Sequence, residues 1–109
     1  MITIEDFKKI DIAVGKILSA EKIPDTEKLL KLSVDLGEES PRQIISGIAL
    51  YFPDCSVLVG KKCMFVVNLE PRIIRGLESN GMLFAVSDND NNFSLLEPDG
   101  IIPIGMRAK

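Results

Sequence analysis

The sequence predicts a small all-β protein, a closed barrel or a sandwich, with one short helix at its N-terminus. At least five short stretches have strand-like apolar patterning, and Gly-, Pro-, Asp- and Asn-containing turns separate them. The length of 109 residues gives room for one core but not two. We therefore expect a single domain over residues 1–109.

The N-terminal residues 3–9 predict a short amphipathic helix. Thr3 is a suitable N-cap, and acidic residues follow it in the first turn, where the helix dipole favours them. Ile4, Phe7 and Ile10 lie on one face at helical spacing. We expect this helix to pack at one end of the β-structure.

Strand patterns dominate the rest of the chain. Period-2 alternation or apolar runs bounded by Gly and Pro predict strands over residues 10–21, 30–36, 42–46 and 61–68. A helical turn is expected over residues 50–52, just before a proline.

The C-terminal third is patterned less regularly. Residues 71–79 have no clean period and predict a loop with a turn of helix. Residues 82–86 and 93–96 flank a polar hairpin tip, and the Pro- and Gly-containing tail predicts loops with at most an edge strand. An OB-like Greek-key barrel of five strands matches this size, although periodicity alone does not separate it from a sandwich.

Missing residue types and motifs exclude most enzymes. There is no histidine, no GxxxxGK[ST] or GxGxxG loop and no GxSxG serine. Cys55 and Cys63 form no CxxC pair, and two free thiols are expected of them. Residues 88–99 start like a calcium loop but lack its glycine and its final glutamate. We expect no catalysis, no metal and no cofactor.

The location of the protein is expected to be cytoplasmic. The apolar runs, such as residues 64–67, are far shorter than the roughly 20 residues of a membrane helix. The N-terminus is acidic and has no apolar segment typical of a signal peptide. No membrane partner is expected.

The charge is acidic on average and locally positive. The net charge of −3 argues against a broadly basic nucleic-acid surface. Residues 40–84, however, carry five basic and three acidic residues. Lys28 and Lys31 flank the start of the 30–36 strand, and Lys31 alternates with Leu30 and Leu32, so it points outward.

Basic residues on a sheet face suit phosphate and ribose contacts, and the alternative is an ordinary solvated face. Aromatic residues make up only 6% of the chain and Trp is absent, so few side chains are available to stack on RNA bases. Recognition of RNA by shape and backbone fits this composition better than sequence readout.

Five segments, in order, resemble the tRNA-binding domain family. They are DIAVGKI at 11–17, PDTEKLLKL at 24–32, RQIISGIA at 42–49, NLEPR with RGLESNGML at 68–83, and LLEPD with PIG at 95–105. Each segment alone is modest, but their order along nearly the whole chain is specific.

The resemblance implies an OB-fold barrel of five strands in Greek-key order, with a short N-terminal helix and a C-terminal extension. The family includes the C-terminal domain or separate β subunit of methionyl-tRNA synthetase, free-standing tRNA-binding homodimers and CsaA-like export chaperones. It implies recognition of folded tRNA without aminoacylation activity. The expected partners are tRNA, a methionyl-tRNA synthetase catalytic subunit and a second copy of the chain. The alternative is a CsaA-like chaperone that binds unfolded protein.

Matching the family's motifs residue by residue implies nine RNA-binding positions: Lys28, Lys31, Arg42, Ser46, Asn68, Arg72, Arg75, Ser79 and Met82. Glu70 departs from the pattern because a basic residue is common there, Ile73 and Ile74 replace a more polar stretch, and Ile23 stands where histidine is usual. The acidic departure is expected to weaken RNA affinity and to raise its salt sensitivity.

Overall fold

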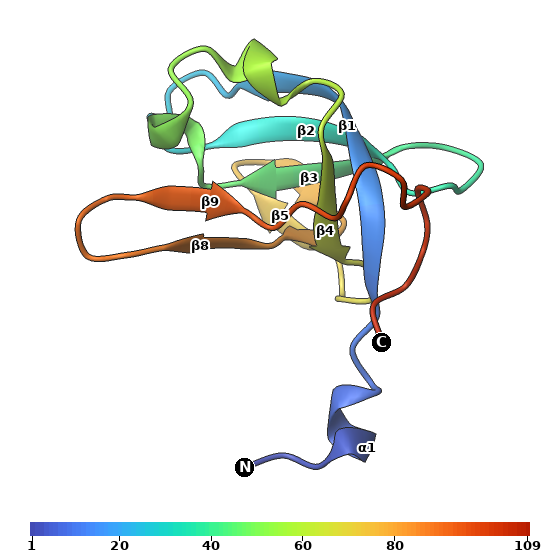
Figure 1. Cartoon of the computed structure of the whole chain (residues 1–109). Coiled ribbons are helices and arrows are strands. Elements are labelled where there is room, and N and C mark those ends of the chain that lie inside the picture. The colour runs from blue at the N-terminus through green and yellow to red at the C-terminus, as the bar shows by residue number, and fades with distance from the viewer.

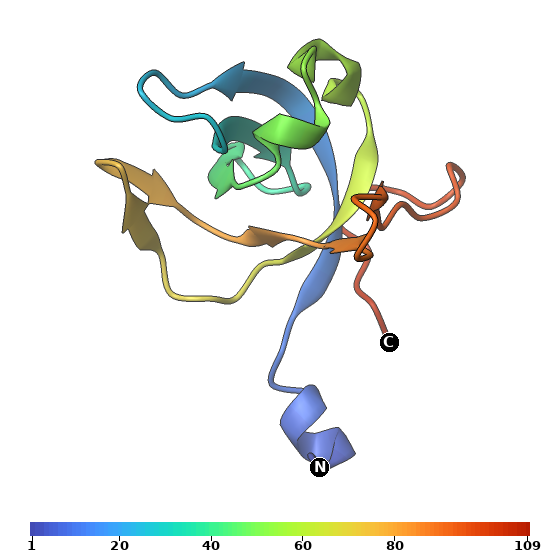
Figure 2. The same cartoon turned by 90° about the vertical axis from the view of Figure 1, so that its left-hand side faces the viewer.

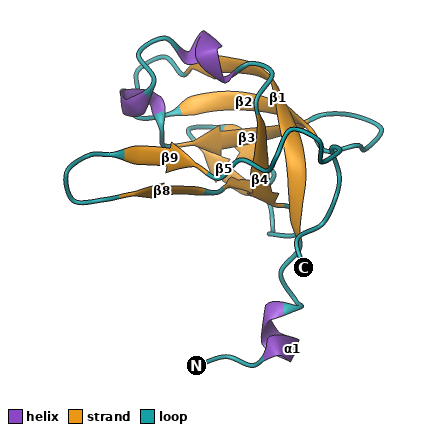
Figure 3. Cartoon of the chain, in the orientation of Figure 1, coloured by secondary structure: helices purple, strands orange, loops and turns teal.

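The computed structural model describes all residues 1–109 and consists mainly of strands (Figures 1 and 3). In chain order the elements are α1 (Ile4–Phe7), β1 (Ile12–Lys22), β2 (Leu30–Asp35), β3 (Arg42–Ser46), the 3₁₀ turns η1 (Ala49–Tyr51) and η2 (Cys55–Leu58), β4 (Lys62–Val66), β5 (Arg72–Ile74), β6 (Leu77–Ser79), β7 (Met82–Leu83), β8 (Ala85–Ser87) and β9 (Phe93–Leu95).

Five strands form one antiparallel sheet in the order β3-β2-β1-β4-β7. The sheet curls until β3 meets the segment leading into β7, where the Asn80 N–H donates to the Gln43 carbonyl at 2.8 Å. The sheet is thereby nearly closed, in the arrangement of an OB-like barrel. The predicted all-β OB-like barrel is confirmed, and the sandwich alternative is wrong.

The long strand β1 connects the two halves of the barrel. Its residues 12–16 pair with β4 and its residues 16–22 pair with β2, with an irregularity between Ile17 and Ser19. Inward-facing side chains from β1, β2, β3 and β4 are fully buried, among them Ile17, Leu32, Ile44 and Phe65. This core holds β2 and β3 as a firm platform.

The prediction for residues 71–79 is wrong, because they form the antiparallel hairpin β5–β6. Its two-residue turn consists of Arg75 at φ 54° and Gly76 at φ 78°. Two successive residues at positive φ are the signature of the type I′ turn that matches strand twist. Arginine at the first of these positions is unusual, and this is why the turn does not stand out in the sequence.

The C-terminal third also differs in detail. The predicted 82–86 strand is broken at Phe84 into β7 and β8, and β8 pairs with β9 instead of joining the barrel. The tail forms no full strand. It runs beside the start of β1 through a bridge between Ala13 and Arg107 and hydrogen bonds to Val14 and Ile12.

Helix α1 has the expected cap but not the expected packing. Thr3 and Asp6 form a reciprocal capping box. None of the helix is buried, and it lies away from the barrel on the side where the C-terminus ends (Figures 1 and 2). The expectation that it packs on the barrel is therefore wrong. No helix in the structure has the length and apolarity to cross a membrane.

Candidate nucleic-acid interface

Two connections flank the outer face of β2 and β3. Residues 23–29 join β1 to β2, and residues 67–81, which contain the β5–β6 hairpin, join β4 to β7. Figure 2 shows both projecting to the same side of the barrel. In OB folds, strands 2 and 3 with these two connections form the surface that binds oligonucleotides.

The register of β2 and β3 decides which side chains lie on that surface. Lys31 is opposite Ile45 and Ser33 is opposite Gln43, whereas Leu32 is opposite Ile44 in the buried row. Side chains directly opposite each other point to the same face. We call the outward row of Lys31, Ser33, Gln43 and Ile45, with the two flanking connections, the β2–β3 face.

Three of the predicted cations on the connections have no partner in the chain. Lys28 precedes β2, Arg72 begins β5 and Arg75 lies in the hairpin turn; all three are exposed and make no ion pair or side-chain hydrogen bond. The fourth cation, Lys31, is half-buried, and its Nζ lies 3.3 Å from Glu21 Oε2. Charges held without partners are available to phosphate groups.

A small recess lies between β3, β7 and the β5–β6 hairpin. It has a volume of about 90 Å³ and is lined by Ile45, Leu69, Glu70, Arg72, Ile74, Ser79, Gly81 and Met82. We call it the Met82 niche. It brings Arg72 and Met82 together, and through Ile45 it adjoins Lys31 on β2.

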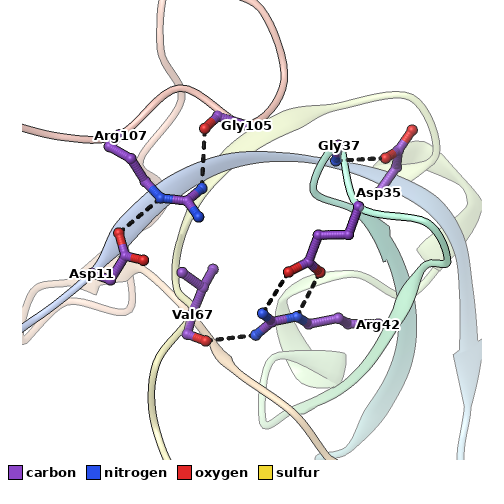
Figure 4. A network of polar contacts seen from close by, with 8 residues as sticks. Asp11, Asp35, Gly37, Arg42, Val67, Gly105 and Arg107 are labelled. Atoms are coloured by element: carbon purple, nitrogen blue, oxygen red, sulfur yellow. Dashed lines mark hydrogen bonds and ion pairs between the residues drawn. The ribbon is translucent and has the colours of Figure 1, made fainter.

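Arg42 is placed differently from its predicted role. It donates two hydrogen bonds to the Glu38 carboxylate, both at 2.8 Å, and one to the Val67 carbonyl at 2.6 Å (Figure 4). The hydrogen bonds from Arg42 lower the pKa of Glu38, and those to Glu38 raise the pKa of Arg42. Arg42 lies opposite Val34 in the inward row of the sheet. Its charge ties the β2–β3 loop to the residue after β4, and its contact with RNA stays a prediction.

Of three further predicted residues, Ser79 and Asn68 are hydrogen-bonded within the protein. Ser46 lies opposite the buried Leu30, in the inward row. Ser79 is 5% exposed, and its Oγ accepts from the Ile45 N–H at 2.9 Å. Asn68 accepts from the Asp11 N–H at 2.8 Å and donates to the Lys9 carbonyl at 2.7 Å. Ser79 and Asn68 thus hold neighbouring segments together, and the RNA-binding role of all three residues stays a prediction.

Sequence reasoning missed Ser33, Gln43 and Ile45 on the face itself. The alternation in residues 30–36 already shows that the odd-numbered side chains of this strand point outward. Because Ser33 is paired with Gln43 and Lys31 with Ile45, the side chains of residues 43 and 45 point outward as well. The pairing register was the missing information.

The largest hollow does not suit RNA. It measures about 720 Å³ and is mostly polar, with the three carboxylates of Glu38, Glu39 and Glu78 against the one cation Arg42. Carboxylates repel phosphate, so this hollow bounds the interface rather than extends it. No three His, Cys, Asp or Glu side chains come together as a metal site.

The chain is similar to segments of known synthetases. It is 43% identical over 109 residues to methionine–tRNA ligase of Methanosarcina mazei, 52% over 99 residues to that of Methanoregula boonei, and 46% over 107 residues to that of Thermotoga maritima. These alignments cover 100%, 90% and 98% of the chain. The chain spans only 14–16% of the length of these relatives.

Similar solved structures extend over the whole chain. A MetRS related protein from Pyrococcus horikoshii superposes with a TM-score of 0.91 at 39% identity, covering 100% of this chain and 98% of that one. The CsaA chaperone protein from Picrophilus torridus superposes with a TM-score of 0.86 at 30% identity, covering 100% of both chains.

The sequence family described as "Putative tRNA binding domain" matches residues 12–107, from the first residue of β1 to the bridge that fixes the tail. This match spans the barrel and both connections that flank the β2–β3 face. The chain therefore belongs to the tRNA-binding domain family.

Proposed function

We propose that the chain binds folded tRNA through phosphate and ribose contacts on the β2–β3 face. It does so as a non-catalytic, cytoplasmic component of methionyl-tRNA synthetase, either as one of its domains or as a separate subunit, or as a stand-alone tRNA-binding protein. The observation that carries this proposal is the set of unpaired cations Lys28, Arg72 and Arg75 on the two connections flanking the face.

The arrangement favours binding of the RNA backbone. Lys28, Lys31, Arg72 and Arg75 hold charge on flexible stems, and none of the residues that make up the β2–β3 face is aromatic. The ring of Tyr51, on η1, stacks on Phe93 at 4.2 Å. Shape and phosphate spacing therefore carry recognition, and a catalytic partner supplies the aminoacylation chemistry.

A filter-binding titration of the chain with tRNA across a salt series tests this proposal. Counterion release from about four phosphates predicts a slope of about −3 in log K against log salt for each chain that contacts one tRNA. No binding at 50 mM salt, or a slope near zero, would refute it.

We further propose that the chain works as a homodimer through α1 and the C-terminal segment. The side chains of Ile4, Phe7 and Ile10 are 63%, 38% and 45% exposed, and with Ala108 they line one hollow. Asn68 fixes the segment that leads to them. An uncovered apolar hollow that joins both chain ends is typical of a surface covered by a second copy.

Sedimentation at micromolar concentration tests the dimer. We expect the wild-type chain to sediment as a dimer and Ile4→Glu to sediment as a monomer. Val86→Glu places the same charge on an exposed residue of β8 and serves as the control. A monomeric wild type would exclude this assembly.

The second candidate function is a chaperone of unfolded protein, which the similarity to CsaA structures favours. Suppression of aggregation of a reduced, denatured protein distinguishes it. Under the tRNA proposal, the chain binds added tRNA and does not change the aggregation of the denatured protein. Under the chaperone alternative, the chain suppresses this aggregation and does not bind tRNA.

A further inference from the structure

The Met82 niche has features that binding of the RNA backbone does not use. Its floor is apolar, with Ile45 only 7% exposed and Ile74 half-buried. Its rim carries an acid, Glu70, and a base, Arg72. Both are exposed, and neither makes a side-chain hydrogen bond or an ion pair, although they line the same recess. A carboxylate acceptor and a guanidinium donor are therefore both free beside an apolar floor.

A ligand that contacts the apolar floor, the Glu70 carboxylate and the Arg72 guanidinium at once needs an apolar body. It also needs N–H donors on one edge for the carboxylate and acceptors on another edge for the guanidinium. A carboxylate only accepts hydrogen bonds, and a guanidinium only donates them. Guanine is the one RNA base with two adjacent donors, N1–H and N2–H₂, on its Watson–Crick edge, and its O6 and N7 accept from arginine. Adenine, cytosine and uracil each place an acceptor next to their donor on that edge, and this acceptor would face the carboxylate.

We propose that the Met82 niche takes the edge of one unpaired guanine of the bound RNA. Glu70 accepts from its N1–H and N2–H₂, Arg72 donates to its O6 and N7, and Met82 packs on the ring. This inference rests on the proposed function, because the RNA must first lie on the β2–β3 face. Unpaired bases of loops and bulges are the ones that proteins read in this way. Glu70 then serves as a base-reading residue, not merely as a repulsive charge.

Methionine methyl NMR on the full chain tests the niche directly. Met82 is 45% exposed at the niche, and Met64 on β4, half-buried and outside it, is the internal control. The probes are the trinucleotides UGU, UAU and UIU, which carry equal charge; the inosine in UIU lacks N2–H₂. We expect UGU to shift the Met82 methyl resonance and to bind about tenfold more tightly than UAU, with UIU between them.

Two variants test whether Glu70, on the rim of the niche, causes the preference for UGU over UAU. Glu70→Gln is expected to bring UGU and UAU to within about twofold of each other, because an amide presents only one acceptor. Glu78→Gln makes the same change of charge on the same hairpin but outside the niche, and it should keep the preference. An unchanged methionine spectrum of the free variants confirms that they are folded.

The outcomes separate this inference from the proposed function. Equal binding of UGU and UAU, or no shift of Met82 at millimolar UGU, overturns the guanine site while salt-dependent tRNA binding keeps the proposed function intact. Loss of the preference in Glu78→Gln as well as in Glu70→Gln also overturns it, because a general charge effect then explains the result. Absence of tRNA binding overturns both.

Discussion

At the scale of single residues, Gly15 is where β1 comes closest to its neighbours. A Cβ at this position would lie 2.7 Å from Val34 Cγ1 and 2.8 Å from Phe65 Cδ2, both of them buried. Gly15→Ala is expected to destabilise the protein by about 2 kcal/mol, the usual cost of overpacking a tight core. Urea unfolding measures it, with Gly47→Ala as the control because a Cβ there meets nothing within 4 Å. Equal midpoints for the two variants would contradict this account of Gly15.

Arg42 is expected to act on stability and not directly on RNA. Its side chain is only 18% exposed, and its removal leaves the Val67 carbonyl and the Glu38 carboxylate without their donor. Arg42→Ala should cost about 2 kcal/mol of unfolding free energy. The variant should keep its tRNA affinity wherever it remains folded. A stable variant that has lost tRNA binding would restore the role in RNA contact that the sequence predicts.

The same pair predicts a dependence of stability on pH. The hydrogen bond from Arg42 lowers the pKa of Glu38 in the folded state. A lowered folded pKa contributes stability that is complete above the ordinary glutamate pKa of about 4.3 and is lost as the pH falls through the folded value. Glu38→Gln should therefore reduce the fall in urea midpoint between neutral and acid pH. An identical fall in variant and wild type would mean that the pair does not contribute.

At the scale of elements, the β5–β6 hairpin carries two of the four cations expected to bind tRNA, Arg72 and Arg75. Arg72→Ala with Arg75→Ala should lower tRNA affinity about tenfold. The salt slope should become shallower by about 1.5 if both cations contact phosphate, and by about 0.7 if Arg72 contacts guanine and only Arg75 contacts phosphate. The thermal midpoint should not change, since both side chains are exposed and unpaired. Lys16→Ala with Lys61→Ala removes the same charge outside both connections and outside the hollow of α1, and should leave the affinity nearly unchanged. Equal effects of the two double variants would assign binding to net charge alone.

At the scale of the whole molecule, the net charge of −3 is compatible with binding through a few unpaired cations. Three unpaired cations, Lys28, Arg72 and Arg75, lie on the two connections that flank the β2–β3 face, and the same connections also carry the exposed acids Asp25, Glu27, Glu70 and Glu78. We expect one face with four cations to bind weakly by itself, and under the dimer proposal a second copy multiplies its effective concentration. Separating the copies by Ile4→Glu is expected to reduce tRNA affinity about a hundredfold without unfolding the barrel. Unchanged affinity of a proven monomer would remove assembly from the binding mechanism.

Local patterning was sufficient for much of the fold. The strand predicted at 42–46 matches β3 residue for residue, and β2 ends one residue before its predicted limit. Such strands can be predicted because the alternation of buried and exposed side chains shows in neighbouring residues of the sequence. The resemblance to the tRNA-binding domain family also followed from ordered local motifs, and the match over residues 12–107 confirms it.

The roles of the individual site residues depended on contacts between distant segments. Arg42, Asn68 and Ser79 look like free polar groups in the sequence, yet their partners Val67, Lys9 and Ile45 lie 25, 59 and 34 positions away. Parity along one strand shows which residues alternate, but the register between strands shows which of them share a face. The type and order of the elements are thus encoded locally, whereas the Met82 niche and the unpaired cations beside it exist only once the barrel has closed.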